Sequence, residues 1–185
     1  MKTKLLAIVL AFTASAVIAS EDNSSMKYNY ISAGMGVIKI DGVGSGTLLN
    51  FEGSFTSGSL IISGAFATDI ESGGDLTATG LGIGYHTPLS IDTDLIFGVS
   101  FAKFSLTLDG IGSGSANNTS LSAGINKMIT DRTSVSANLG VSLSGGGIGF
   151  GFGLTQSLTD SMAVGLSYTP GNGGSLTTLG LQYRL

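Results

Sequence analysis

The sequence predicts an all-β protein: a closed antiparallel up-and-down transmembrane β-barrel of ten strands. Short segments alternate apolar residues with Gly, Ser, Ala, Thr or Asn, and the polar positions of these segments carry almost no charge. The chain has 185 residues, of which 30 are Gly, 2 are Pro and 11% are charged. Alternation with a period of two indicates strands with one apolar face. A polar face built from small neutral residues indicates that this face is enclosed, because a sheet face exposed to water is normally charged.

The first 20 residues have the layout of a secretory signal peptide. Lys2 and Lys4 precede the apolar run from Leu5 to Phe12, and small residues follow as far as Ser20. The run is too short to cross a membrane as a helix. We therefore expect residues 1–20 to be a signal peptide, cleaved after Ala19 or Ser20, and residues 21–185 to form one barrel domain.

Charge and cysteine content exclude several classes of function. The chain has 8 basic and 12 acidic residues, and removing Lys2 and Lys4 leaves 6 against 12, a formal charge of −6. This balance argues against nucleic acid as a partner, because phosphates are bound by Lys and Arg. The absence of Cys excludes disulfides, cysteine-based zinc sites and thiol nucleophiles. We expect no cofactor and no metal site.

The first half of the chain predicts five strands. They run from Lys27 to Ile40, Thr47 to Phe55, Leu60 to Ala67, Leu76 to His86 and Leu95 to Leu108. In the fifth, the apolar positions are in register as far as Phe101 and resume at Phe104, which is a shift of one residue. The shift predicts a β-bulge near Ala102 and Lys103.

The second half predicts five more strands, which makes the total even. They contain Leu121 to Ile125, Val135 to Leu143, Ile148 to Leu154, Val164 to Tyr168 and Ser175 to Leu185. Short turns join alternate strands, and somewhat longer Gly, Ser and Asp loops, including residues 109–118, join the others. This asymmetry is typical of bacterial outer-membrane barrels.

The final strand predicts how the sheet closes. Leu179, Leu181, Tyr183 and Leu185 share one face and no tail follows them in the sequence. An unpaired edge with four apolar side chains in a row would promote aggregation. We therefore expect this strand to pair with the first one.

The same segment resembles the C-terminal assembly signal of Gram-negative outer-membrane barrels. Thr178, Gly180, Tyr183 and Leu185 carry this likeness, with Leu where the usual terminal residue is Phe. The whole chain after residue 20 resembles the small outer-membrane barrels of the OmpA, OmpX and opacity-protein type. The resemblance implies a place in the outer membrane, contact with its lipid and lipopolysaccharide, and insertion by the barrel-assembly machinery. Because those barrels mostly have eight strands, an eight-strand barrel in which the third strand or the 144–147 loop is misassigned is the alternative.

Aromatic and charged residues give two further expectations about the wall. Tyr30, Phe55, Tyr85 and Tyr183 lie at the short-turn ends of their strands, as an aromatic girdle would. The other expectation concerns the lumen. Alternation places Glu52 there, and the predicted bulge turns Lys103 toward it. Opposite charges in a confined lumen should pair, because an unpartnered charge there is costly.

His86, the one histidine, is interpreted as a lumen or rim residue. It has no carboxylate beside it in the sequence, and a general base needs an orienting partner. The predicted function is therefore a non-enzymatic outer-membrane barrel with a structural or surface role. The alternatives are a narrow passive pore and a soluble periplasmic β-barrel that binds an apolar ligand. The oligomeric state is left open.

Overall fold

The computed structural model describes residues 26–42, 44–70, 74–108, 112–145, 147–171 and 173–185, so the expected signal peptide lies outside the described residues. Ten strands make up most of the described chain. They are β1 (Tyr30–Ile40), β2 (Gly44–Ser57), β3 (Leu60–Asp69), β4 (Gly74–Ser90), β5 (Thr93–Leu108), β6 (Gly112–Thr130), β7 (Thr133–Ser142), β8 (Ile148–Ser157), β9 (Met162–Gly171) and β10 (Gly174–Arg184). The described residues contain no helix that is long and apolar enough to cross a membrane.

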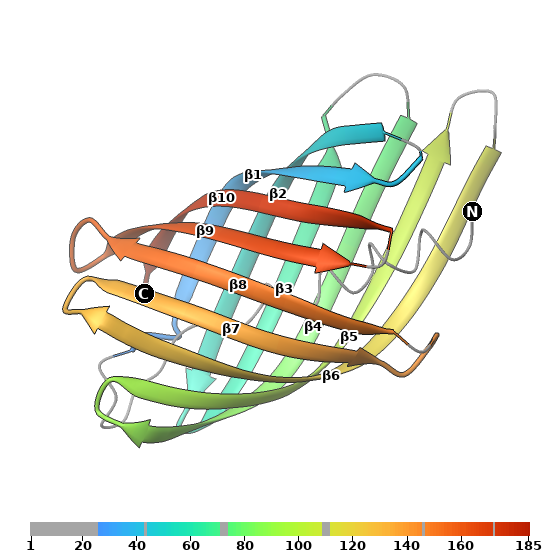
Figure 1. Ribbon diagram of the computed structural model, residues 1–185. Coiled ribbons are helices and arrows are strands. Elements are labelled where there is room, and N and C mark those ends of the chain that lie inside the picture. The colour runs from blue at the N-terminus through green and yellow to red at the C-terminus, as the bar shows by residue number, and fades with distance from the viewer. Residues whose placement is uncertain (1–25, 43, 71–73, 109–111, 146, 172) are drawn as a thin grey trace.

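The ten strands close into one antiparallel barrel in which each strand pairs with the next and β1 pairs with β10 (Figure 1). The closing seam runs from Tyr30 opposite Arg184 to Ile40 opposite Gly174. The predicted class, strand number and closure are confirmed. The eight-strand alternative is wrong, because β3 pairs with both β2 and β4 and because β7 and β8 are separate paired strands.

The two ends of the barrel differ in which strands they join. At the turn end, tight connections join β2 to β3, β4 to β5, β6 to β7 and β8 to β9. The start of β1 and the C-terminus, which Figure 1 marks with C, lie at this end as well. The other five connections form the loop end. An even number of strands brings the start of the first strand and the end of the last strand to the same end.

Close approach of two backbones explains a pair of glycines at the seam. Gly34 of β1 lies opposite Gly180 of β10. A Cβ on Gly34 would meet the Leu179 carbonyl oxygen and would lie 2.7 Å from the Gly180 Cα. Because no larger residue fits there without moving the backbone, glycine lets β1 and β10 pair closely.

The outer wall is apolar and the lumen is lined by small polar residues. Leu139, Phe152 and Leu166 point outward and are 42%, 53% and 46% exposed, whereas the inward-facing Ser142 is 4% exposed. A water-soluble barrel has the opposite arrangement, with its apolar residues inside. A continuous apolar belt of this kind is stable against lipid rather than against water.

The bulge predicted near Ala102 and Lys103 is wrong. β5 pairs with β6 without a register shift from Thr93 to Leu108, and its pairing with β4 is continuous through the same region. Phe101 points outward and is 47% exposed, whereas Phe104 points inward and is 1% exposed. The apolar residues change face because the surroundings of the strand change. Beyond Phe101 the outer face is polar and the inner face packs on a dry cluster.

β4 and β6 extend further at the loop end than the sequence predicts, whereas β5 ends at Leu108 as predicted. β4, β5 and β6 have 17, 16 and 19 residues, and much of the segment 109–118 that was expected to be a loop belongs to β6. The ladder continues there because backbone hydrogen bonds do not require apolar side chains. Polar outer residues and the inward-facing Phe104 and Leu106 replace the alternation that was used to recognise the strands.

The predicted aromatic girdle is confirmed for three of its four members. Phe55, Tyr85 and Tyr183 point outward at the turn end and are 58%, 55% and 52% exposed. The expected place of Tyr30 in the girdle is wrong, because this side chain is 2% exposed and lies inside the barrel. Tyr30 is adjacent to Ile31, which faces outward, so Tyr30 lies on the inward face of β1.

Candidate functional site: the barrel interior

The loop end of the lumen contains an apolar cluster that we call the loop-end seal. Its members come from β1 to β5 and from β10, and every one is at most 5% exposed. They are Ile38, Leu48, Ala67, Leu76, Ala78, Ala102, Phe104 and Leu176. Since neither water nor ions are stable among such side chains, this part of the lumen is dry.

The turn end of the lumen is filled by a mixed cluster around Tyr28, which we call the turn-end cluster. The Tyr28 hydroxyl donates a 2.9 Å hydrogen bond to Oδ2 of Asp94. The Tyr28 ring lies 4.7 Å from the His86 ring, measured between centroids. Tyr28, His86 and Asp94 are 0%, 1% and 0% exposed, and Tyr30, Ile61 and Ile96 pack with them.

The segment before β1 is fastened to the wall by Asn29. Its side-chain Oδ1 accepts hydrogen bonds from the Thr56 backbone N–H at 2.6 Å and from the Thr56 hydroxyl at 2.9 Å. The backbone carbonyl oxygen of Asn29 accepts a 3.0 Å hydrogen bond from the Leu185 backbone N–H. These contacts to β2 and to the C-terminus hold Tyr28 in the mouth of the barrel.

The expectation that His86 lacks a carboxylate neighbour is wrong. Its Nδ1 lies 3.7 Å from Oδ2 of Asp94, which is the first inward-facing residue of β5. Its Nε2 lies 3.3 Å from the Gly58 carbonyl oxygen. In a catalytic dyad this nitrogen faces a nucleophile. The ring is instead fastened to the main chain, so the geometry favours a packing role.

Burial raises the pKa of the Tyr28 phenol above its usual range, and the neighbouring Asp94 carboxylate raises it further. Both effects disfavour a phenolate, since a buried negative charge beside another is costly. Tyr28 therefore remains a hydrogen-bond donor at neutral pH.

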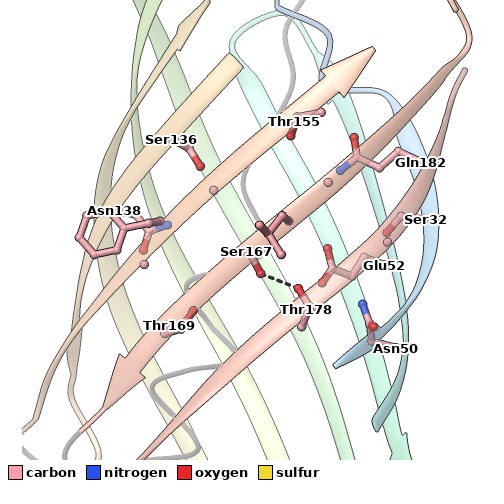
Figure 2. Close-up of a pocket in the computed structure, with 16 residues that line it drawn as sticks. Ser32, Asn50, Glu52, Ser136, Asn138, Thr155, Ser167, Thr169, Thr178 and Gln182 are labelled. Carbon is pink, nitrogen blue, oxygen red and sulfur yellow. Dashed lines mark hydrogen bonds between the residues drawn. The ribbon is translucent and has the colours of Figure 1, made fainter. Parts of the chain in front are cut away.

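Between the two ends, the lumen retains a polar cavity of about 50 Å³ along β7–β10, β1 and β2. A volume of this size holds a few water molecules. Figure 2 shows the lining side chains, which include Ser32, Asn50, Glu52, Ser136, Asn138, Thr155, Ser167, Thr169, Thr178 and Gln182. The hydroxyls of Ser167 and Thr178 are hydrogen-bonded across β9 and β10.

A second hollow, of about 370 Å³, lies at the turn end on the same side of the barrel. Ser134, Ser157 and Arg184 line it, each one inward-facing position from a residue that lines the polar cavity. Thr155 and Gln182 are at the nearer edge of the cavity, and Thr155 is 3% exposed. The two spaces therefore follow β7–β10, and the cavity adjoins the loop-end seal where Asn50 and Thr178 are each one inward-facing position from Leu48 and Leu176.

The two charges predicted for the lumen do not meet. Glu52 lies in the lumen and lines the cavity. Lys103 lies on the outer face of β5, opposite Thr79 of β4, because the bulge that would have turned it inward is absent. The expected Glu52–Lys103 pair is therefore wrong.

The four residues of the expected assembly signal are divided between the two faces of β10. Thr178 and Gly180 face the lumen and line the cavity. Tyr183 and Leu185 face outward and are 52% and 70% exposed. Their outward side chains extend the apolar belt to the turn end of the seam.

Asp94 is the interior residue that reasoning from the sequence missed. Its signal was present, because the outward positions Leu95 and Phe97 place Asp94 on the lumen face by parity. The same argument from Tyr85 places His86 inside. Asp94 lies just before Leu95, where the predicted strand begins. Among the described residues, no group of three His, Cys, Asp or Glu side chains is arranged to bind a metal ion.

No protein-family model and no curated protein sequence matches the chain. Solved structures do. The KdgM porin has a TM-score of 0.51 at 10% identity, over 83% of this chain and 99% of that one. The Neisserial surface protein A has a TM-score of 0.43 at 12% identity, over 84% and 96% of the two chains. Outer membrane phospholipase A from Escherichia coli has a TM-score of 0.47 at 9% identity, over 83% and 90%. At these identities the likeness to the KdgM porin shows a shared barrel fold.

Proposed function

We propose that the chain is a small non-enzymatic barrel of the bacterial outer membrane with a structural or surface role. The observation that carries this proposal is the combination of an apolar outer belt with a lumen that side chains fill. The belt supports a membrane location. The filled lumen supports a role that depends on the wall and the loop end rather than on transport.

The size of the cavity argues against passage of solutes. About 50 Å³ is enough for a few waters and is far below the 300–1,000 Å³, roughly, of sites that enclose small molecules. The loop-end seal occupies the side of the lumen formed by β1–β5 and β10, and Tyr28 occupies the turn end.

Export and assembly follow from the sequence in this proposal. Residues 1–20 direct secretion, and the C-terminal segment with Thr178, Gly180, Tyr183 and Leu185 is presented to the barrel-assembly machinery. Outer-membrane lipid and lipopolysaccharide then cover the belt. The closed seam supports this role for β10, since β1 has its full set of partners only when β10 is present.

A narrow passive pore is the second candidate, and the alignment of the two polar spaces along β7–β10 favours it. Gln182 lies where they meet, with its Nε2 3.4 Å from the position a Cβ on Gly165 would occupy. A small displacement of this side chain would join the spaces. The pore would pass water or small ions, because small polar side chains and Glu52 line the cavity and charged side chains line the turn-end hollow, namely Lys27, Asp131, Arg132, Asp160 and Arg184.

Two measurements test the proposal. Fractionation of cells expressing the full chain is expected to recover it from the outer membrane, and recovery from the soluble periplasm would contradict the membrane role. Purified protein in a planar bilayer is expected to show no steady single-channel conductance at neutral pH. Regular conductance steps, like those of an open porin, would favour the second candidate.

A further inference from the structure

Two glycines distinguish one sector of the outer wall. Gly53 of β2 and Gly64 of β3 lie opposite each other and face outward. The other described glycines in the middle of the strands face the lumen. Leu81 and then Phe101 continue this row across β4 and β5. The outer surface is therefore depressed over β2 and β3 within the apolar belt.

The next row toward the loop end borders this depression. It runs through Phe51, Phe66, Thr79 and Lys103, each in register with its neighbour on the adjacent strand. Between the two rows lies an apolar groove of about 570 Å³. Three gaps between strands make it roughly 14 Å long.

Lys103 lies beside this groove, opposite the lining residue Thr79 and two residues beyond the lining residue Phe101 on the outer face of β5. On the outer face of β5, the residues on the turn-end side of Lys103 are Phe97, Val99 and Phe101, and those on its loop-end side are Ser105 and Thr107. Lys103 thus marks the boundary between the apolar belt and water. Its side chain is exposed and forms no ion pair with any described residue.

We infer that the groove binds one phosphate-bearing lipid of the outer leaflet, of the lipopolysaccharide class. Lys103 contacts a phosphate of the headgroup, and one acyl chain lies between the Phe51–Phe66 row and the Gly53–Gly64 row. This inference rests on the proposed outer-membrane location, in which the loop end faces the outer leaflet.

Charge complementarity favours this occupant over a second copy of the chain. A protein partner would have to present an acidic residue to Lys103 at the edge of the belt. On the outer faces of the described strands the acidic residue is Asp75, which lies opposite Thr107 and well above the groove. A lipid phosphate sits at the level of Lys103 because headgroups form that boundary.

Substitutions at Gly64 and Lys103 test the two halves of the site. A Cβ on Gly64 would be 3.7 Å from the Leu81 Cδ2 and 3.9 Å from the Gly80 carbonyl oxygen, which are ordinary contacts. Gly64→Leu therefore fills the groove without straining the wall. Lys103→Ala removes the cation. The matched controls are Ala123→Leu, on the outer face of β6, and Lys39→Ala, on the outer face of β1.

The measurement is native mass spectrometry of the full, folded barrel in detergent, titrated with hexa-acylated lipid A. Wild type and both controls are expected to bind one molecule with equal affinity. One Lys beside anionic lipid contributes about 1 kcal/mol, so Lys103→Ala should weaken binding about fivefold. Gly64→Leu should cause a loss of similar size. Resistance to unfolding on unheated gels verifies that each variant is folded.

Equal binding by all five proteins, or the same loss in the controls, would overturn the lipid site. A dimer that Gly64→Leu abolishes would assign the groove to a second copy instead. Fractionation separates the two proposals: a protein that resides in the outer membrane yet binds no lipid A contradicts this inference alone.

Discussion

Tyr28 is the side chain on which packing at the turn end depends. Replacing it with Phe keeps the ring against His86 but removes the donor to Asp94. Because a buried carboxylate then loses its partner, Tyr28→Phe should lower the free energy of unfolding by about 1–3 kcal/mol. Denaturant titration in detergent measures this. Tyr85→Phe, on the outer face, is the control, and equal losses in the two variants would contradict the role of the hydrogen bond.

The raised pKa of Tyr28 predicts how stability changes in alkali. A phenol whose pKa is higher in the folded state than in the unfolded state stabilises the fold fully below the unfolded value, near 10, and this contribution is lost as pH rises above it. Wild type should therefore lose stability more steeply than Tyr28→Phe between pH 9 and about 12. Parallel curves of unfolding free energy against pH would contradict the assignment.

Leu166 tests which solvent surrounds the wall. It lies in the middle of β9 and faces outward. Leu166→Arg should destabilise the barrel by roughly 2–4 kcal/mol, the range for a cation near the midplane of a bilayer. Leu166→Met, which keeps an apolar surface, should cost well under that. Folding titrations in liposomes provide the measurement, and a tolerated Arg would argue against lipid at this face.

At the scale of one element, β5 contains the sharpest change of environment. Phe101 and Phe104 are three residues apart in an unbroken strand, yet one is 47% and the other 1% exposed. Phe104→Ala leaves a cavity in the loop-end seal and should cost about 3–5 kcal/mol, whereas Phe101→Ala removes only lipid contact and should cost less. Equal costs would indicate that both side chains share one face.

β10 carries a prediction about assembly. Deleting residues 183–185 removes the pairs of Tyr183 with Ile31 and Met162, and the hydrogen bond from Leu185 to Asn29. The turn end of the seam then opens and exposes an unpaired edge. The truncated protein should be degraded before it reaches the outer membrane, as immunoblots of fractions would show. Normal levels in the membrane would contradict the importance of closure.

At the scale of the whole molecule, the lumen has a dry side and a wet side. Gln182→Gly should join the two polar spaces along β7–β10 and produce measurable ion conductance in a planar bilayer. Phe104→Ala enlarges the lumen by a comparable change, but within the apolar seal, where a cavity stays dry. The Phe104→Ala variant should therefore show no ion conductance. Conductance from Phe104→Ala would show that the seal, rather than Gln182, limits passage.

The sequence by itself determined the strand number, the closure and the inside-out polarity. These properties follow from the alternation of neighbouring residues such as Leu139 and Gly140, or from the need to pair the strand that ends in Arg184. Alternation failed where the solvent outside the strand changed. The apolar face of β5 moved inward at Phe104 and was interpreted as a bulge.

Only the tertiary structure decided which residues meet. His86 and Asp94 come together because β4 and β5 pair in one particular register, and Glu52 and Lys103 separate because the same register keeps Lys103 outside. The outer groove likewise requires Gly53 and Gly64 to lie opposite each other. Parity assigns a side chain to a face, but its neighbours across the sheet depend on register, which hydrogen bonds between distant segments of the chain determine.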